Sequence, residues 1–239
     1  MAEIRPAIFI GLGSTGKEIL ENLVELMSEH YGSHTLSNLP IFRFIAFETD
    51  KGNNSHVNGI ELKHLTITNT GYIKDHIYEK KYLKDWLDIN LLDIPGGKFE
   101  DGASHIRMAG RLCLWENWRT VREIFYGSGD EDKGVVNIKE PVNIGKAEDT
   151  IRNYYNKIGK IFNPANHVVD TNPDGTTNPI IYIVGTLYGG TCSGMFIDIA
   201  YLAKMVFGLF AFQLPNINLA PVRGIFTVCD SREINAAAD

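Results

Sequence analysis

The chain has 239 residues, 44% of them apolar and 22% charged, as in an ordinary globular protein. Its formal net charge of −6 offers no basic surface for nucleic acid or for an anionic membrane, so we expect neither as a partner. The cysteines argue against a disulfide framework and against a zinc site of paired cysteines, because they are odd in number and far apart: Cys113, Cys192 and Cys229. We assign no metal ligands among the side chains.

The first fifty residues predict a strand, a long helix and a second strand. An apolar run at 7–10 is stopped by a glycine, as a buried parallel strand would be. Apolar residues then recur at helical spacing to about Tyr31, and Thr15 is the expected N-cap. Residues 41–47 predict a second apolar strand, which ends in the polar run Glu-Thr-Asp at 48–50.

The middle of the chain is less regular. We expect a strand at 60–67, helices at 75–87, 106–125 and 146–162, a chain break at 95–97, and polar loops at 126–134 and 170–178. This stretch is interpreted as an inserted helical and loop region at about 68–178.

The last third predicts a strand at 180–184, a glycine-rich loop at 185–194, an apolar helix at 195–208 and a strand at 222–228. Strands alternate with helices throughout, which indicates an α/β fold: a doubly wound, mostly parallel sheet with helices on both faces. The apolar helix is short for a membrane span and carries Asp198 and Lys204. Since no signal peptide precedes the first strand, we expect a cytoplasmic protein without a membrane span.

A glycine-rich loop at 11–16 lies between the first predicted strand and helix, where free N–H groups can bind an anion. One interpretation is a tight turn that binds nothing. The dinucleotide pattern GxGxxG is also met, although the acidic strand end that should hold the ribose comes late. The Walker A spacing is met up to Lys17, but Glu18 then replaces the hydroxyl residue that should hold magnesium.

A second glycine loop, 185–194, also joins a strand to a helix. Two such loops can bind one polyphosphate from both sides. A dinucleotide site or a Walker site needs only one glycine loop, so neither interpretation explains the second loop. The second loop contributes the hydroxyls of Thr191 and Ser193, and the acidic strand end at 48–50 lies between the two loops in the sequence.

These segments resemble those of the tubulin/FtsZ family. Residues 188–194 read Tyr-Gly-Gly-Thr-Cys-Ser-Gly and match the family's phosphate loop, Gly-Gly-Gly-Thr-Gly-Ser/Ala-Gly, at five of seven positions. The loop at 11–16 resembles the first nucleotide loop of FtsZ, and the strand ending at 48–50 resembles the segment that ends in Asn-Thr-Asp. Gly102-Ala103, followed by Gly110-Arg111, is similar to the loop that contacts the terminal phosphate and leads into a helix.

The resemblance implies a single nucleotide-binding domain over residues 1–239, Rossmann-related in fold, which binds GTP or GDP with Mg²⁺. It implies that Thr49 and Asp50 lie near the ribose or the metal and that Ala103 lies near the terminal phosphate. Cys192 replaces a family glycine and is expected to hold its loop further from the phosphate, while Glu18 replaces the asparagine that reads guanine. The full set of expected nucleotide-binding residues is Gly11, Leu12, Gly13, Ser14, Thr15, Gly16, Glu18, Glu48, Thr49, Asp50, Ala103, Arg107, Gly189, Gly190, Thr191, Cys192, Ser193 and Gly194.

No catalytic residue can be assigned from the sequence. In the family, a neighbouring subunit brings the acidic residues that complete hydrolysis, so the resemblance implies head-to-tail self-association into filaments. We expect no hydrolysis loop and no second, activation domain in this chain, which makes it either a fragment or a divergent member. Two alternatives remain: an NAD(P)-dependent oxidoreductase that uses the loop at 11–16, and a non-catalytic scaffold with a degenerate nucleotide pocket.

Overall fold

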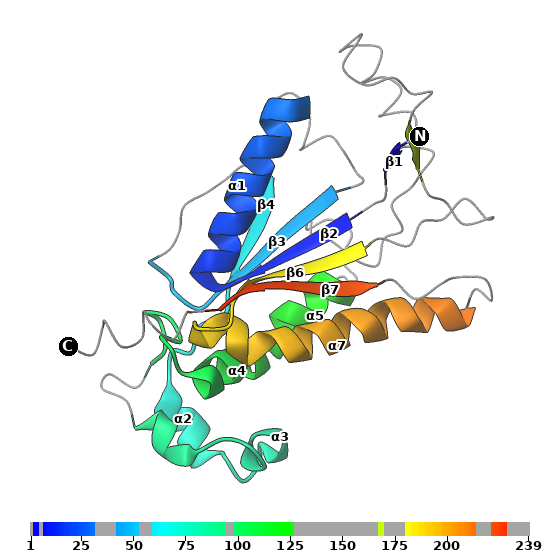
Figure 1. Cartoon of the computed structure of the whole chain (residues 1–239). Coiled ribbons are helices and arrows are strands. Elements are labelled where there is room, and N and C mark those ends of the chain that lie inside the picture. The colour runs from blue at the N-terminus through cyan, green and yellow to red at the C-terminus, as the bar shows by residue number, and fades with distance from the viewer. Residues whose placement is uncertain are drawn as a thin grey trace.

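The computed structural model describes residues 2–4, 7–31, 42–52, 59–93, 98–126, 167–169, 180–213 and 221–228. Its centre is a five-stranded, fully parallel sheet in the order β4-β3-β2-β6-β7 (Figure 1). The strands are β2 (Ala7–Leu12), β3 (Phe42–Glu48), β4 (Ile60–His64), β6 (Ile180–Thr186) and β7 (Val222–Thr227). The predicted α/β fold with a parallel sheet is therefore confirmed.

A short second sheet was not predicted from the sequence. It pairs β1 (Ala2–Ile4) with β5 (His167–Val169) in parallel. Each strand has only three residues, too few for a period-two pattern to be recognisable.

The strand order contains a reversal beside β2. The chain runs from β2 outwards through β3 to β4, and then returns to the other side of β2 for β6 and β7. Such a reversal opens a crevice at the carboxyl ends of the two strands that flank it, which is where open α/β sheets bind ligands. The topology alone therefore places a candidate site beyond Leu12 and Thr186, the last residues of β2 and β6.

Helices cover both faces of the sheet (Figure 1). One face carries α1 (Gly13–Tyr31), and the other carries α4 (Arg107–Glu116), α5 (Trp118–Tyr126) and α7 (Gly190–Gln213). Side chains of β3 alternate between the two cores: Phe44 packs with Leu20 and Val24 of α1, whereas Ile45 and Phe47 pack with the helices opposite. Each large side chain buried in this way stabilises the fold by roughly 1.5–3 kcal/mol.

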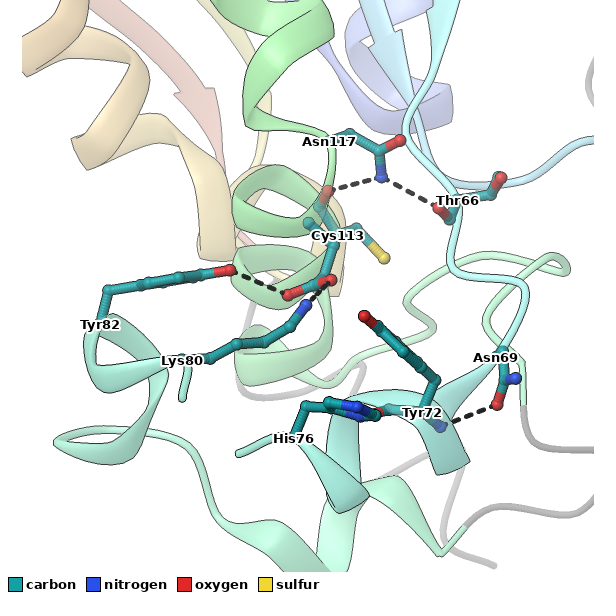
Figure 2. A network of polar contacts seen from close by, with 9 residues as sticks. Thr66, Asn69, Tyr72, His76, Lys80, Tyr82, Cys113 and Asn117 are labelled. Atoms are coloured by element: carbon teal, nitrogen blue, oxygen red, sulfur yellow. Dashed lines mark hydrogen bonds and ion pairs between the residues drawn. The ribbon is translucent and has the colours of Figure 1, made fainter. Parts of the chain in front are cut away.

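A helical excursion between β4 and α4 lies beyond α4, on the side away from the sheet (Figure 1). It consists of α2 (Thr70–Asp75), α3 (Lys81–Lys84) and the 3-10 turn η2 (Ile89–Leu92). Figure 2 shows how it is anchored: Lys80 Nζ lies 2.5 Å from Glu116 Oε2, and the Tyr82 hydroxyl donates to Glu116 Oε1 at 3.3 Å. Burial, together with the neighbouring Glu116 carboxylate, raises the pKa of Tyr82 to about 12.

The helix boundaries in this region differ from the prediction. The predicted helix at 75–87 is wrong, because Asn69 caps α2 by accepting from Tyr72 N at 2.9 Å and the chain then turns before α3. The predicted helix at 106–125 is two helices separated by Asn117, whose side chain donates to Cys113 O and to Thr66 O, each at 2.9 Å (Figure 2). The strand predicted at 60–67 ends at His64.

Several predicted elements lie outside the described residues. These are the break at 95–97, the loop at 170–178 and the helix at 146–162. The loop predicted at 126–134 also lies outside, except for Tyr126, which is the last residue of α5. In the part of the chain that is described, no helix is both long and apolar enough to cross a membrane.

Candidate functional site

A pocket of about 200 Å³ lies at the carboxyl edge of the sheet, where the topology places the crevice. Four segments form it: the start of α1, the end of β3, the segment before α4, and the segment that joins β6 to α7. Its lining comprises Leu12, Gly13, Ser14, Thr15, Glu48, Thr49, Asp50, Asp101, Gly102, Ala103, Ser104, Thr186, Gly189, Thr191 and Cys192.

Two helices begin at this pocket, both at the same end of the sheet (Figure 1). We predicted that α1 would start from Thr15 and α7 at Met195, but the helices begin earlier, at Gly13 and Gly190. Of the residues interpreted as loops, 13–16 and 190–194 are therefore the first helical turns. N–H groups of a first turn lack intrahelical acceptors and carry the positive end of the helix dipole, so both helices present anion-binding groups to the pocket.

Gly13 brings the two helix starts together. Its φ of +72° is a conformation that L side chains rarely adopt, and a Cβ atom built there would lie 3.2 Å from Thr191 Cβ. Gly13 is thus required by the backbone of the pocket itself.

The other two glycines of the segment at 11–16, Gly11 and Gly16, allow close packing instead. A Cβ atom on Gly11 would lie 2.6 Å from Gly16 O, and one on Gly16 would lie 2.6 Å from Val184 O. Neither residue is part of the pocket lining. Their absent side chains let α1 approach β2 and β6 closely.

Glycines of α4 and of the start of α7 let these two helices pack closely. A Cβ atom on Gly110 would lie 2.1 Å from Gly190 O, and one on Gly194 would lie 2.3 Å from Arg107 O. Gly190 also uses its N–H group, which donates to Ser104 O at 2.6 Å. Gly190 and Gly194, which were expected to contact phosphate, therefore lie behind the pocket lining and hold its walls together.

Other expected site residues also lie outside the lining. The Ser193 hydroxyl donates to Gly189 O at 2.7 Å. The side chains of Glu18 and Arg107 are exposed on α1 and α4. Lys17, the lysine of the Walker-like spacing, is buried in α1 with its Nζ 3.6 Å from Glu21 Oε1.

Glu48 ties the start of α1 to the end of β3. Its side chain is only 1% exposed. One carboxylate oxygen accepts from Thr49 N at 2.8 Å and from Asp50 N at 3.3 Å, and the other accepts from the Ser14 hydroxyl at 2.8 Å. The buried charge is thus surrounded by donors, as a buried carboxylate requires.

Thr49 joins three of the four segments that form the pocket. Its hydroxyl oxygen accepts from Ala103 N at 2.9 Å and lies 2.7 Å from the hydroxyl oxygen of Thr191. Thr49 is fully buried, and Thr191 is 7% exposed.

The lining also contains residues that we did not assign to the site from the sequence: Asp101, Gly102, Ser104 and Thr186. The resemblance pointed to the loop that contains Gly102, but only the fold shows that the backbone of Asp101 pairs with that of Asp50. Thr186 could have been assigned to the site only from its place at the end of a strand beside the reversal. The described lining carries three carboxylates and neither lysine nor arginine, so an anion there depends on N–H groups, hydroxyls and a bound cation.

Cys192 lines the pocket, and its thiol lies against Gly185. A Cβ atom on Gly185 would lie 2.6 Å from Cys192 Sγ, so the absent side chain of Gly185 leaves room for the thiol. Burial raises the pKa of Cys192 to about 12. The thiol is therefore protonated at neutral pH and unsuited to act as a nucleophile.

The fold and the pocket together define a class of protein. A parallel sheet with a strand-order reversal, and two helix N-termini directed at a pocket beside it, is the architecture of nucleotide-binding α/β domains. Comparison with known families agrees: a family model described as tubulin-like matches residues 8–221. The chain belongs to this tubulin-like family. Searches of curated proteins and of solved structures returned no match.

Proposed function

We propose that the chain binds a guanine nucleotide, GTP or GDP, by its phosphates in the pocket at the carboxyl edge of the sheet. The observation that carries this proposal is the convergence of two helix N-termini on one pocket at the strand-order reversal. Membership of the tubulin-like family supports it further.

The phosphate oxygens would be bound mainly by neutral donors. Gly13, Ser14 and Thr15 line the pocket in the first turn of α1, and Thr191 and Cys192 line it in the first turn of α7, so their N–H groups are the donors we propose. Backbone donors of this kind bind phosphate without a lysine or an arginine.

A magnesium ion fits the chemistry of the remaining lining. Asp50 and Asp101 supply the carboxylate oxygens that Mg²⁺ prefers, and Mg²⁺ is commonly bound by one or two carboxylates together with phosphate oxygens and water. The described residues hold no group of three or more His, Cys, Asp or Glu side chains that could bind a metal ion. We therefore propose that the ion binds with the nucleotide and screens the phosphates from the carboxylates.

The base and the ribose would extend beyond a pocket of this size. About 200 Å³ is less than the 300–1,000 Å³ usual for drug-sized ligands, so the pocket suits the phosphates. The exposed Glu18 lies one turn along α1 from the lining, and its carboxylate can accept hydrogen bonds from the N1–H and amino groups of guanine.

For activity, we propose nucleotide-dependent head-to-tail self-assembly, with hydrolysis completed by a neighbouring copy. Among the described lining residues, Glu48 already accepts from three donors and Cys192 is protonated, so neither is suited to act as a general base. A heterologous contact of this kind produces filaments rather than closed dimers, and sedimentation with GTP would detect them.

Thermal unfolding tests the binding proposal. The purified chain is heated with Mg²⁺ and saturating GTP, GDP, ATP or NAD⁺ in parallel. A ligand present at about 100 times its Kd stabilises the folded state by roughly 2.7 kcal/mol, which raises the Tm of a domain this size by about 5–10 °C.

Selective stabilisation by GTP and GDP is the expected result. Stabilisation by NAD⁺ alone would favour an oxidoreductase instead. If no ligand changes the Tm, the chain is better described as a scaffold with a degenerate pocket.

A further inference from the structure

The hydroxyls at the pocket are not equivalent as donors. In the lining, the Ser14 hydroxyl donates to Glu48 Oε2 and the Thr186 hydroxyl donates to Thr227 O at 3.4 Å. Outside the lining, the hydroxyl of Ser193 donates to Gly189 O. Thr191 differs because its only neighbour within hydrogen-bond distance among the described side chains is another hydroxyl, that of Thr49. Which of the two hydroxyls donates decides whether Thr191 keeps a proton for the pocket.

The surroundings of Thr49 settle the direction of this hydrogen bond. A hydroxyl has one proton and two acceptor positions, and Ala103 N–H, which can only donate, occupies one acceptor position at 2.9 Å. Among the described residues, Thr191 Oγ1 is the single acceptor within reach of the Thr49 proton. If Thr191 donated to Thr49 instead, the proton of a fully buried hydroxyl would be left without an acceptor, which is unfavourable.

We propose that Thr49 is a positioning residue: held by Ala103 N–H, it donates to Thr191 Oγ1 and so turns the Thr191 proton towards the anion in the pocket. This inference rests on the proposed nucleotide site. The chain from Ala103 N–H through Thr49 to Thr191 runs in one direction, so each hydrogen bond strengthens the next.

The composition of the lining makes the Thr191 proton important for binding an anion. Three carboxylates and no lysine or arginine face the pocket in the described lining, so each neutral donor makes a large contribution to binding a phosphate. Thr191 lies in the first turn of α7, where its N–H group and its hydroxyl can both donate to one oxygen. Thr49 makes no such contact itself and acts through Thr191.

The test is a double-mutant cycle on Mg²⁺–GTP affinity, with Thr49→Val, Thr191→Val and the double variant. Each single change should weaken binding about tenfold, the usual effect of losing one hydrogen bond to a charged group. The double variant should bind no more than about twofold more weakly than Thr191→Val alone, because the two residues act as one unit. Thr49→Ser keeps the hydroxyl and should restore affinity to within about twofold of the original chain.

The Tm without nucleotide separates positioning from folding. The GTP affinities of Thr49→Val and Thr49→Ser are compared at equal folded fraction. If the role of Thr49 is merely structural, Thr49→Val will have a lower Tm but the folded protein will keep its affinity. Independent, multiplicative losses in the double variant would overturn the inference, as would full affinity in Thr49→Val. If Thr49→Val does not fold, Thr191→Val alone decides, and unchanged GTP affinity there overturns the inference.

The two proposals fail in different ways. If the original chain does not bind GTP, the proposed function falls and takes the positioning role with it. If the original chain binds GTP but the losses multiply, only the role of Thr49 is wrong.

Discussion

The two glycine-rich segments look alike along the chain but use their glycines differently. At the start of α1, Gly13 adopts a left-handed conformation at the pocket, while Gly11 and Gly16 let the helix pack on the sheet. At the start of α7, Gly190 and Gly194 make room for α4, and the pocket is lined by their neighbours. A glycine in a helix-start motif can therefore mark close backbone packing just as well as contact with a ligand.

We expect the largest difference in stability between substitutions at two adjacent glycines of the second segment, Gly190 and Gly189. In Gly190→Ala, the new methyl group would lie 2.6 Å from Ala103 O and 2.7 Å from Ile106 O, both backbone atoms. We expect a loss of about 3 kcal/mol in the free energy of unfolding, measured by urea denaturation. Gly189→Ala is the matched control, since its methyl group meets only Thr186 Cγ2 at 3.3 Å, and it should stay within about 0.5 kcal/mol. Equal effects of the two changes would contradict the packing role of Gly190.

Substitutions at two glycines of the first segment should cost less stability and should differ from each other in GTP affinity. In Gly16→Ala the methyl group would lie 2.6 Å from Val184 O, and we expect a loss of about 2 kcal/mol. Gly13→Ala introduces a side chain at a φ of +72°, which costs about 1–2 kcal/mol. Of the two, only Gly13→Ala should also weaken GTP binding once each variant is corrected for its folded fraction, because only Gly13 lines the pocket. A weaker affinity in Gly16→Ala alone would reverse this assignment.

Glu48 lies at the end of β3 and contacts the first segment through the Ser14 hydroxyl. Glu48→Gln keeps the size of the side chain but removes its charge. The amide oxygen can still accept from Thr49 N, whereas the NH₂ group faces the Ser14 hydroxyl, which must turn from donor to acceptor. We expect a loss of about 2 kcal/mol in the free energy of unfolding. A urea titration of the variant measures it, with Glu18→Gln on the exposed face of α1 as the control that should not change. Unchanged stability in Glu48→Gln would mean that the carboxylate does not hold β3 to α1.

Cys192 gives the second segment a pH dependence. Burial raises the pKa of this thiol from 9.0 to about 12, so between these values the folded chain keeps a proton that the unfolded chain loses. Stability from this group is complete below pH 9 and falls as the pH rises towards 12. In Cys192→Ala, stability measured from pH 8 to 11 should fall less steeply than in the original chain. Equal slopes would show that the thiol is not desolvated in the folded protein.

The sequence predicted the regular parts of the fold because their signals are local. Apolar runs marked β2, β3, β6 and β7, and helical spacing marked α1, each with an end within a few residues of the observed one. Alternation of strands and helices was enough to predict a parallel α/β sheet.

What the sequence did not predict depends on tertiary contacts. The glycines of the α4–α7 contact are far apart in the chain, so the spacing around Gly190 suggested a phosphate loop rather than a helix crossing. Asn117 separates α4 from α5 through a hydrogen bond to Thr66 O, 51 residues away. The pocket position of Ser104 follows from a left-handed backbone, with a φ of 51°, set by its surroundings.

The central claim, that this pocket binds the nucleotide, is tested most directly at Ser104. This exposed residue lines the pocket, and Asp and Asn both tolerate its left-handed backbone. Ser104→Asp adds a fourth carboxylate to the lining, whereas Ser104→Asn has the same shape without the charge.

Calorimetric titration with GTP and Mg²⁺ compares the three proteins. We predict saturable binding to the original chain and to Ser104→Asn, with affinity at least about tenfold lower in Ser104→Asp, because the added charge repels the phosphates. No saturable binding to the original chain, or equal affinity in the Asp and Asn variants, would contradict it.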